Sequence, residues 1–293
     1  MGTELVDGII YKAYGGFYFV SGGGDSWRCT LRGVLRRRGI EVLVGDRVSF
    51  RPGSSLTGVV EKVHPRSNAL ARPPVANVDL AVIVFAVRDP EPSLALLDRF
   101  LVQAEFHNVR PVVCINKIDL KGETSPAGME AYSAAGYLVI ETSAKSGAGI
   151  KLLREAISGG LTVFAGPSGV GKSSLLNEIQ PGLSLKTGEV GEKIKRGRHT
   201  TRHVELIALA GGGLMADTPG FSSLYLPEIK REELAFFFPE MARYHTGCRF
   251  SGCLHKTEPD CSVKKAVSAG ELDAARYDRY LAILDGITGR ERS

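Results

Sequence analysis

The eight residues at 166–173 constrain the fold of this chain more than any other part of its sequence. They read Gly-Pro-Ser-Gly-Val-Gly-Lys-Ser and match G-x-x-x-x-G-K-[S/T], a loop whose backbone N–H groups enclose phosphates. An apolar run at 161–165 precedes the loop and a helical pattern follows it, which is the context that this motif requires. We therefore expect a nucleoside triphosphate to bind at Gly166, Pro167, Ser168, Gly169, Val170, Gly171, Lys172, Ser173 and Ser174.

Two further motifs, each placed after a predicted strand, indicate that the base is guanine. Asn116-Lys-Ile-Asp119 follows the strand pattern at 111–115, and Asp119 can accept hydrogen bonds from guanine N1–H and N2, which adenine does not offer. Lys117 would pack its stem on the base, and Asn116 would brace neighbouring loops. The strand pattern at 137–142 is followed by residues whose backbone N–H groups would reach guanine O6: Ser143, Ala144 and Lys145. GTP and GDP are the expected ligands.

Magnesium ligands are predicted around the phosphate loop. In this motif the lysine reaches the β- and γ-phosphate oxygens, and the Ser173 hydroxyl binds Mg²⁺. Asp217-Thr-Pro-Gly220 comes 45 residues after Lys172, where a Mg²⁺-associated carboxylate is expected, and the Gly220 N–H would sense the γ-phosphate. Between them, either Thr200 or Thr201 would complete the metal shell.

The group that orients the attacking water is not the usual one. Phe221 follows Gly220, where Ras-like enzymes have a glutamine, and an aromatic side chain cannot orient water. Hydrolysis by the chain alone is therefore expected to be slow. His199 is the best candidate for this task, although an exposed histidine without a chemical role is the alternative. The expected catalytic residues are His199, Lys172, Thr200, Thr201 and Asp217.

The order of these motifs is unusual. In ordinary small GTPases the phosphate loop comes first, whereas here both guanine motifs precede it. The same site can form if the usual termini are joined and the chain is opened after Gly220, because surface termini often lie close together. We therefore predict a circularly permuted GTPase domain. Residues 221–226 would then lead directly into the C-terminal domain and could transmit the nucleotide state to it.

A cysteine-rich segment predicts one structural zinc ion per chain. Cys248, Cys253, His255 and Cys261 lie within 14 residues and provide the four ligands of a closed Cys₃His site. A catalytic zinc would need an open position, and the alternative to structural zinc is four unliganded side chains. His245 is expected to be a surface residue.

The first 72 residues predict a small barrel that binds a polyanion. Short strand patterns at 8–14, 17–20, 27–31, 47–51 and 57–63 alternate with glycine-rich turns, which favours an OB-fold, although other small barrels would look similar. This segment holds 11 basic and six acidic side chains, so its net charge of +5 equals that of the whole chain. A solvated basic face without a partner is the alternative. The expected RNA contacts are Arg28, Arg32, Arg36, Arg37 and Arg38, the last three in a loop.

The remaining sequence completes a three-domain prediction. Residues 73–226 alternate strands with helices, as an α/β GTPase domain requires, and residues 227–293 are mostly helical around the zinc ligands. The last helix is expected at about 271–286, with Ser268 and Glu271 as its capping box. No apolar run reaches the length of a membrane span and no leader pattern is present, so we expect a cytoplasmic protein without membrane contact, and a monomer.

Taken together, these motifs resemble the RsgA/YjeQ/YloQ family of bacterial circularly permuted GTPases over nearly the whole chain. The resemblance implies an N-terminal OB-fold, a central GTPase domain and a C-terminal zinc domain. It also implies binding to the 30S ribosomal subunit and its 16S rRNA late in maturation, with GTP hydrolysis stimulated by the subunit. His199 matches the histidine that this family is thought to use for hydrolysis. Arg202 stands where many relatives are expected to have Thr or Ser.

Three functions are compatible with the sequence. The first is a GTPase activated by ribosomal RNA or protein. The second is a nucleotide-switched RNA-binding module whose slow hydrolysis is incidental, as Phe221 would allow. The third is a basic-barrel protein that acts on another RNA or on DNA. Stimulated hydrolysis distinguishes the first from the second, and competition with bulk nucleic acid at stated salt tests the third.

Overall fold

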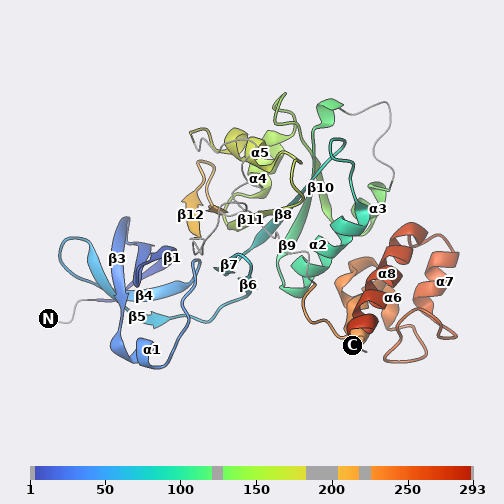
Figure 1. Ribbon diagram of the computed structural model, residues 1–293, viewed down its shortest axis with the longest axis horizontal. Helices are drawn as coiled ribbons and strands as arrows, with labels where there is room; N and C mark the ends of the chain where they lie inside the picture. Colours follow the sequence, from blue (N-terminus) through green and yellow to red (C-terminus); the bar gives the residue numbers. More distant parts are fainter. Residues whose placement is uncertain (1–3, 121–127, 183–203, 218–225, 292–293) are drawn as a thin grey trace.

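The computed structural model describes residues 4–120, 128–182, 204–217 and 226–291 of the 293-residue chain. Figure 1 shows a blue N-terminal barrel and a group of orange and red C-terminal helices at opposite ends of a central sheet. His199, Thr200, Thr201 and Gly220 lie outside the described residues. Among the helices that are described, none is both long and apolar enough to cross a membrane.

The N-terminal part is a closed barrel of five strands, as predicted. The strand order is β1-β2-β3-β5-β4, and pairing of β1 with β4 closes it. Inward-facing side chains such as Ile10, Val20 and Phe50 are completely buried and form its core. The strands are β1 (Val6–Tyr14), β2 (Phe17–Gly22), β3 (Asp25–Leu31), β4 (Arg47–Pro52) and β5 (Thr57–Val63).

The arginine cluster of the barrel lies in a helix and not in a loop, so the sequence prediction was wrong here. Arg36 and Arg37 form the last turn of helix α1 (Gly33–Arg37), and Arg38 is its C-cap. Leu35 packs into the barrel core and so anchors this turn. Basic residues at the end of a helix are stabilised by its dipole.

The central domain is a mostly parallel sheet in the order β10-β9-β8-β11-β13-β12. The strands β8, β9, β10, β11 and β13 run parallel, and β12 pairs antiparallel with β13. The strands are β8 (Leu80–Ala86), β9 (Arg110–Asn116), β10 (Leu138–Glu141), β11 (Leu161–Ala165), β12 (Glu205–Ala208) and β13 (Leu214–Asp217).

Helices cover both faces of this sheet, as the α/β prediction requires. All seven residues of β8 are buried, because one face packs on a core that includes α2 and α3 and the other on a core that includes α4 and α5. The helices are α2 (Leu94–Phe106), α3 (Glu130–Ala134), α4 (Ile150–Ala156) and α5 (Lys172–Ile179), together with a 3₁₀ turn at Ile118–Leu120.

A short hairpin that the sequence pattern did not reveal connects the barrel to the central domain. It consists of β6 (Ala69–Ala71) and β7 (Pro74–Ala76), each three residues long, which is too short to show an alternating pattern. The domain boundary expected between residues 72 and 73 falls in its turn. Leu70 and Val75 both pack into the core of the central domain.

The C-terminal part is helical around its own core. Its elements are a 3₁₀ segment at Arg231–Phe237, α6 (Pro239–His245), α7 (Ser262–Ser268) and α8 (Ala274–Glu291). The predicted capping box was wrong, because Ser268 ends α7 and its hydroxyl donates to the carbonyl of Lys264. Asp273 caps α8 instead, since its Oδ1 accepts the N–H of Arg276 at 2.7 Å.

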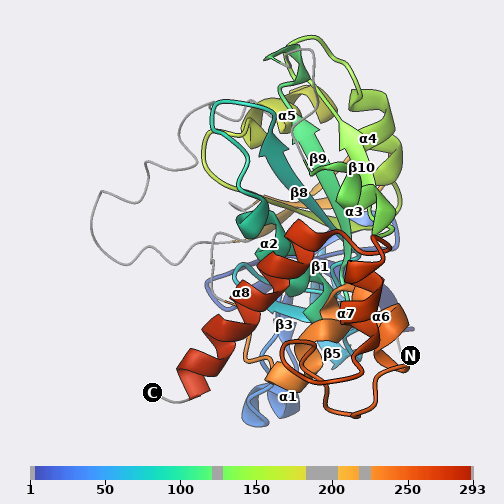
Figure 2. The same cartoon turned by 90° about the vertical axis from the view of Figure 1, so that its right-hand side faces the viewer.

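A buried ion cluster joins the C-terminal helices to the central domain. Arg276 of α8 is 2% exposed and donates to Asp98 of α2, at 2.5 Å, and to Glu240 of α6. Asp98 is completely buried and also accepts hydrogen bonds from Arg279 and from the Tyr132 hydroxyl. Figure 2 shows the red helix α8 crossing in front of α2. The cluster therefore connects three helices with α3.

Candidate functional site

The phosphate loop lies between β11 and α5, and two of its glycines are required by close approaches of other chain segments. Gly166 has a φ of +131°, and a Cβ there would lie 2.1 Å from the carbonyl oxygen of Val84. Gly171 has a φ of +91°, and its Cβ would lie 2.4 Å from Nδ2 of Asn116. Larger residues would push the loop away from the sheet.

Lys172 and Ser173 at the start of α5 are residue types that bind phosphate and a metal ion. The Nζ of Lys172 donates to the carbonyl oxygens of Gly166 and Pro167, at 2.9 and 2.6 Å, so the side chain folds back over the loop. Burial lowers the pKa of Lys172 to about 8, because a charged amine is poorly solvated there. A bound phosphate would favour the charged form. Ser173 is buried at the same helix start.

Asn116 connects the phosphate loop to both guanine motifs. It ends β9 and is 1% exposed. Its Nδ2 donates to the carbonyl of Val170 in the phosphate loop at 2.8 Å, and its Oδ1 accepts from the Ala144 N–H and the Thr142 hydroxyl, each at 3.3 Å. This bracing was expected of Asn116. The buried Thr142 takes part in it as well.

Asp119 is held as an exposed, ionised hydrogen-bond acceptor. The hydroxyl of Ser143 donates to its Oδ1 at 2.6 Å, and this bond lowers the pKa of the Asp119 carboxyl. The exposed carboxylate remains accessible to a ligand. Lys117, two residues earlier, has a left-handed backbone and donates from Nζ to the carbonyl of Asp89. A base lying along the Lys117 stem would meet Asp119 at its edge.

These motifs converge because they follow parallel strands. The segments after β9, β10 and β11 leave the same edge of the sheet, and β13, which ends at Asp217, runs parallel to β11. The motifs therefore lie at the same edge of the sheet, whatever their order along the chain. The described residues bring the phosphate loop, Asn116–Asp119 and Ser143–Lys145 together, and the edge has the chemistry for a guanine nucleotide.

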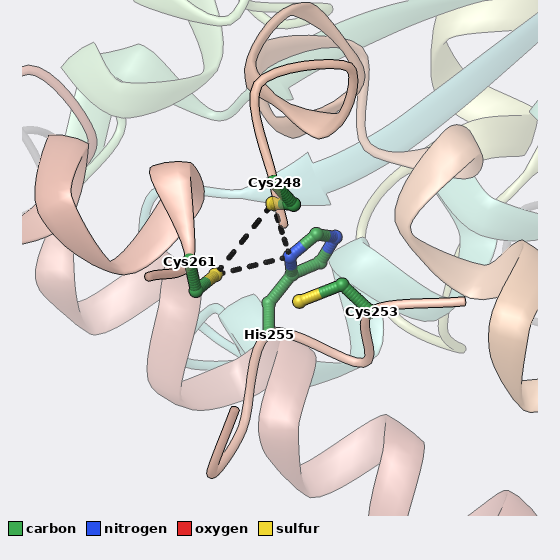
Figure 3. A group of neighbouring side chains, drawn as sticks. All are labelled: Cys248, Cys253, His255 and Cys261. Carbon is green, nitrogen blue, oxygen red and sulfur yellow. Dashed lines mark hydrogen bonds between the residues drawn. The ribbon is translucent and has the colours of Figure 1, made fainter. Parts of the chain in front are cut away.

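The second candidate site is the Cys₃His group of the C-terminal domain (Figure 3). The ligand atoms of Cys248, Cys253, His255 and Cys261 all lie within 4.8 Å of one another. The Sγ atoms of Cys248 and Cys261 are 3.9 Å apart, and His255 Nδ1 lies 3.6 and 3.2 Å from them. A tetrahedral zinc with bonds of about 2.3 Å to sulfur and about 2.0 Å to nitrogen requires similar separations. The residues fit zinc, as predicted.

Neighbouring side chains hold the zinc loop in shape. His255 has a left-handed backbone, with a φ of +55°, and the hydroxyl groups of Tyr277 and Tyr280 donate to the carbonyls of His255 and Leu254. The Glu258 carboxylate accepts three backbone N–H groups of the same loop. These bonds fix the loop that carries the ligands and so reduce the ordering that metal binding requires.

His245 is the site residue that the sequence analysis missed. It was expected at the surface, but its Nδ1 lies 3.1 Å from His255 Nε2, and its ring packs 4.6 Å from that of Phe236. Burial, together with His245, lowers the pKa of His255 to about 4, so His255 is neutral. With Nδ1 turned toward the thiols as a zinc ligand, His255 would carry its proton on Nε2 and would donate it to His245. In the sequence, the only sign of this hydrogen-bond partner of His255 is that His245 lies close to the Cys₃His motif.

Replacing His245 by phenylalanine is expected to lower zinc affinity about tenfold to a hundredfold. Phenylalanine keeps a ring against Phe236 but cannot accept the His255 proton, so the ligand loses its orienting bond. The matched control is His245→Asn, in which the amide oxygen takes the place of Nδ1 as the hydrogen-bond acceptor. This variant should retain most of the zinc affinity. The measurement is zinc transfer from the full chain to a chromogenic chelator. Equal retention by the phenylalanine variant and the wild type would contradict this role.

The barrel arginines are distributed over a strand and a helix. The guanidinium of Arg28, on β3, lies 5.0 Å from the ring centre of Phe17. Arg32 precedes α1 and forms a 2.8 Å ion pair with Glu61, which reduces its charge toward a partner. Arg28 with Phe17, and the basic end of α1, are cationic and aromatic groups of kinds that suit nucleic acid.

Comparison with known proteins identifies matching families over most of the chain. The model described as RsgA GTPase matches residues 63–227, and the RsgA N-terminal domain matches residues 7–60. A Moorella thermoacetica protein named small ribosomal subunit biogenesis GTPase RsgA is 49% identical over 288 residues, covering 98% of this chain and 99% of that protein. A protein of the same name from Carboxydothermus hydrogenoformans is 46% identical over 291 residues, covering 98% and 100%.

Solved structures match as well. YloQ, described as a circularly permuted GTPase, superposes with a TM-score of 0.86 at 41% identity, covering 99% of this chain and 97% of that one. YjeQ from Thermotoga maritima superposes with a TM-score of 0.88 at 39% identity, covering 98% and 99%. These matches confirm the permuted domain that the motif order predicted.

Proposed function

Because this chain belongs to the RsgA family and is a GTP-hydrolysing enzyme, we propose that it acts on the small ribosomal subunit during maturation. In this proposal the 30S subunit binds the GTP-bound protein and stimulates hydrolysis, and conversion to GDP leads to release. The barrel contacts 16S rRNA through Arg28, Arg32, Arg36, Arg37 and Arg38. The protein works as a cytoplasmic monomer without membrane contact, and its units are residues 1–72, 73–226 and 227–293.

The observation that carries this proposal is the convergence of three motifs at one sheet edge beside a basic barrel. Asn116 holds the phosphate loop and the 142–144 segment together, so base and phosphates are read as one unit. The relatives over the full length of the chain are named for small-subunit biogenesis. A nucleotide site joined to a polyanion-binding barrel suits such a task.

Each site residue has a proposed part in hydrolysis. Backbone N–H groups of residues 166–174 and Lys172 hold the phosphates, while Asp119 and residues 143–145 hold guanine. Ser173, Asp217 and one of Thr200 and Thr201 would hold Mg²⁺, which when bound offsets phosphate charge. His199 is proposed to orient the attacking water, and Gly220 to contact the γ-phosphate. Zinc, held by the Cys₃His group, would only stabilise the C-terminal domain.

The proposal is tested by GTP hydrolysis with and without purified 30S, 50S and 70S particles. We expect 30S subunits to raise the rate by about tenfold or more, because the chain has no glutamine after Gly220 and relies on its partner. Co-sedimentation should be stronger with a non-hydrolysable GTP analogue than with GDP. An unchanged rate in the presence of 30S subunits would refute the proposal.

A second candidate function is a nucleotide-switched RNA-binding module, and Phe221 after Gly220 is the observation that favours it. In that case the biological effect requires GTP binding but not turnover. The variant His199→Ala would then lose stimulated hydrolysis and still support subunit maturation. Loss of both would favour the GTPase mechanism.

A further inference from the structure

The barrel is joined to the nucleotide-binding sheet by strand pairing. Lys12 of β1 pairs antiparallel with Glu205 of β12, so the two sheets continue into each other. The Lys12 ammonium lies 2.8 Å from the Glu205 carboxylate, and this bond raises the pKa of Lys12. In Figure 1, β12 is the element of the central domain that reaches toward the blue barrel.

Apolar packing and a close backbone contact support this junction. Ile9, Tyr11 and Ala13, which alternate along β1, pack against the central core that contains Leu206 of β12 and Ala216 of β13. At a second point, Gly45 lies against β7, where a Cβ would stand 2.1 Å from the carbonyl oxygen of Ala76. The barrel therefore cannot rotate on the central domain without disturbing β12.

The register of the strands extends this contact to the nucleotide edge. Glu205 is paired with Lys12 on one side and with Asp217 on the other. Lys12, Glu205 and Asp217 thus form one row across β1, β12 and β13, with neighbouring strands about 4.8 Å apart. Asp217 is the residue that the sequence predicts beside Mg²⁺. One strand separates this residue from the barrel.

We propose that Lys12 and Glu205 are positioning residues for GTP hydrolysis, which set the place of Asp217 through the paired strands. Docking of the barrel on the small subunit would then change the position of Asp217, the residue predicted beside Mg²⁺, through β12. This last step rests on the proposed function. Both residues lie outside the predicted nucleotide-binding motifs, so in this proposal the pair acts through the backbone of β13.

Charge reversal tests the pair. Lys12→Glu and Glu205→Lys each place like charges opposite one another, and the double variant restores the pair in reverse. Each single variant should lower the 30S-stimulated rate about threefold to tenfold and raise the Mg²⁺ concentration needed for half-maximal hydrolysis, and the double variant should recover both. Lys62→Glu, which changes the same charge on an exposed position of β5, is the control and should not alter the Mg²⁺ dependence.

The readouts separate this inference from the proposed function. If wild type is not stimulated by 30S subunits, the proposed function fails, while the Mg²⁺ dependence of unstimulated hydrolysis still decides the role of the pair. Thermal unfolding shows whether each charge-reversal variant folds. If one does not, Glu205→Gln replaces it in the test, because it removes the charge without reversing it. Wild-type Mg²⁺ dependence in Lys12→Glu, Glu205→Lys and Glu205→Gln would overturn the inference.

Discussion

Replacing Asp119 by asparagine is expected to lower GTP affinity about a hundredfold or more and to shift preference toward xanthosine triphosphate. The carboxylate accepts two donors of guanine, whereas an asparagine amide places its own N–H group against one of them. Xanthine carries a carbonyl at that position and would accept the amide proton. The Ser143 hydroxyl, 2.6 Å from Asp119 Oδ1, can donate equally to the asparagine oxygen, so the loop should keep its shape.

Competition binding with GTP and xanthosine triphosphate measures this shift. The matched control is Ser143→Ala, which leaves the carboxylate but removes the bond that orients it. Loss of one such hydrogen bond is expected to weaken GTP binding about tenfold at most, without a change of base preference. If Asp119→Asn kept the preference of the wild type, Asp119 would not belong to the guanine site.

Removing the Arg276 guanidinium is expected to lower the free energy of unfolding by about 3–5 kcal/mol. In Arg276→Met, Asp98 and Glu240 lose their shared partner while staying buried, and Arg279 compensates only Asp98. The aromatic rings of Tyr132 and Phe238, 4.7 and 5.1 Å from the guanidinium carbon, lose a cation as well. The C-terminal helices should therefore separate from α2 at lower denaturant concentration.

Urea unfolding followed by circular dichroism measures this loss. Arg276→Lys keeps the charge but not the fork that reaches both carboxylates, and should fall between the wild type and Arg276→Met. The exposed pair of Arg249 with Asp260 provides the control, since Arg249→Met should cost about 0–1 kcal/mol. A similarly small cost for Arg276→Met would mean that the cluster does not hold the two parts together.

The sequence analysis succeeded wherever a few neighbouring residues carry the structure. The loop between β11 and α5 and the Cys₃His group are each built from residues close in sequence, and the strands of the barrel and sheet show clear alternation or apolar runs. It failed where the local pattern was ambiguous. Arg36–Arg38 fits a loop or a helical turn equally well, and only burial of Leu35 favours the helix. From its sequence neighbours, Ser268 could cap the last helix or end the helix before it. The packing of α7 favours the latter, and Ser268 is its last residue.

Sequence by itself predicted a circularly permuted GTPase with a Cys₃His group, because phosphate, guanine and zinc motifs depend on residue types at short, fixed spacings. Tertiary structure alone decided how the three parts are connected. The Lys12–Glu205 pair joins residues 193 positions apart, and the Arg276–Asp98 contact joins residues 178 apart. Such contacts leave no periodic signal, since any exposed lysine or buried arginine could find many partners until the sheet and helices fix its surroundings. The +5 charge of the barrel segment predicts a polyanionic partner, but only strand pairing showed that the barrel abuts the nucleotide sheet.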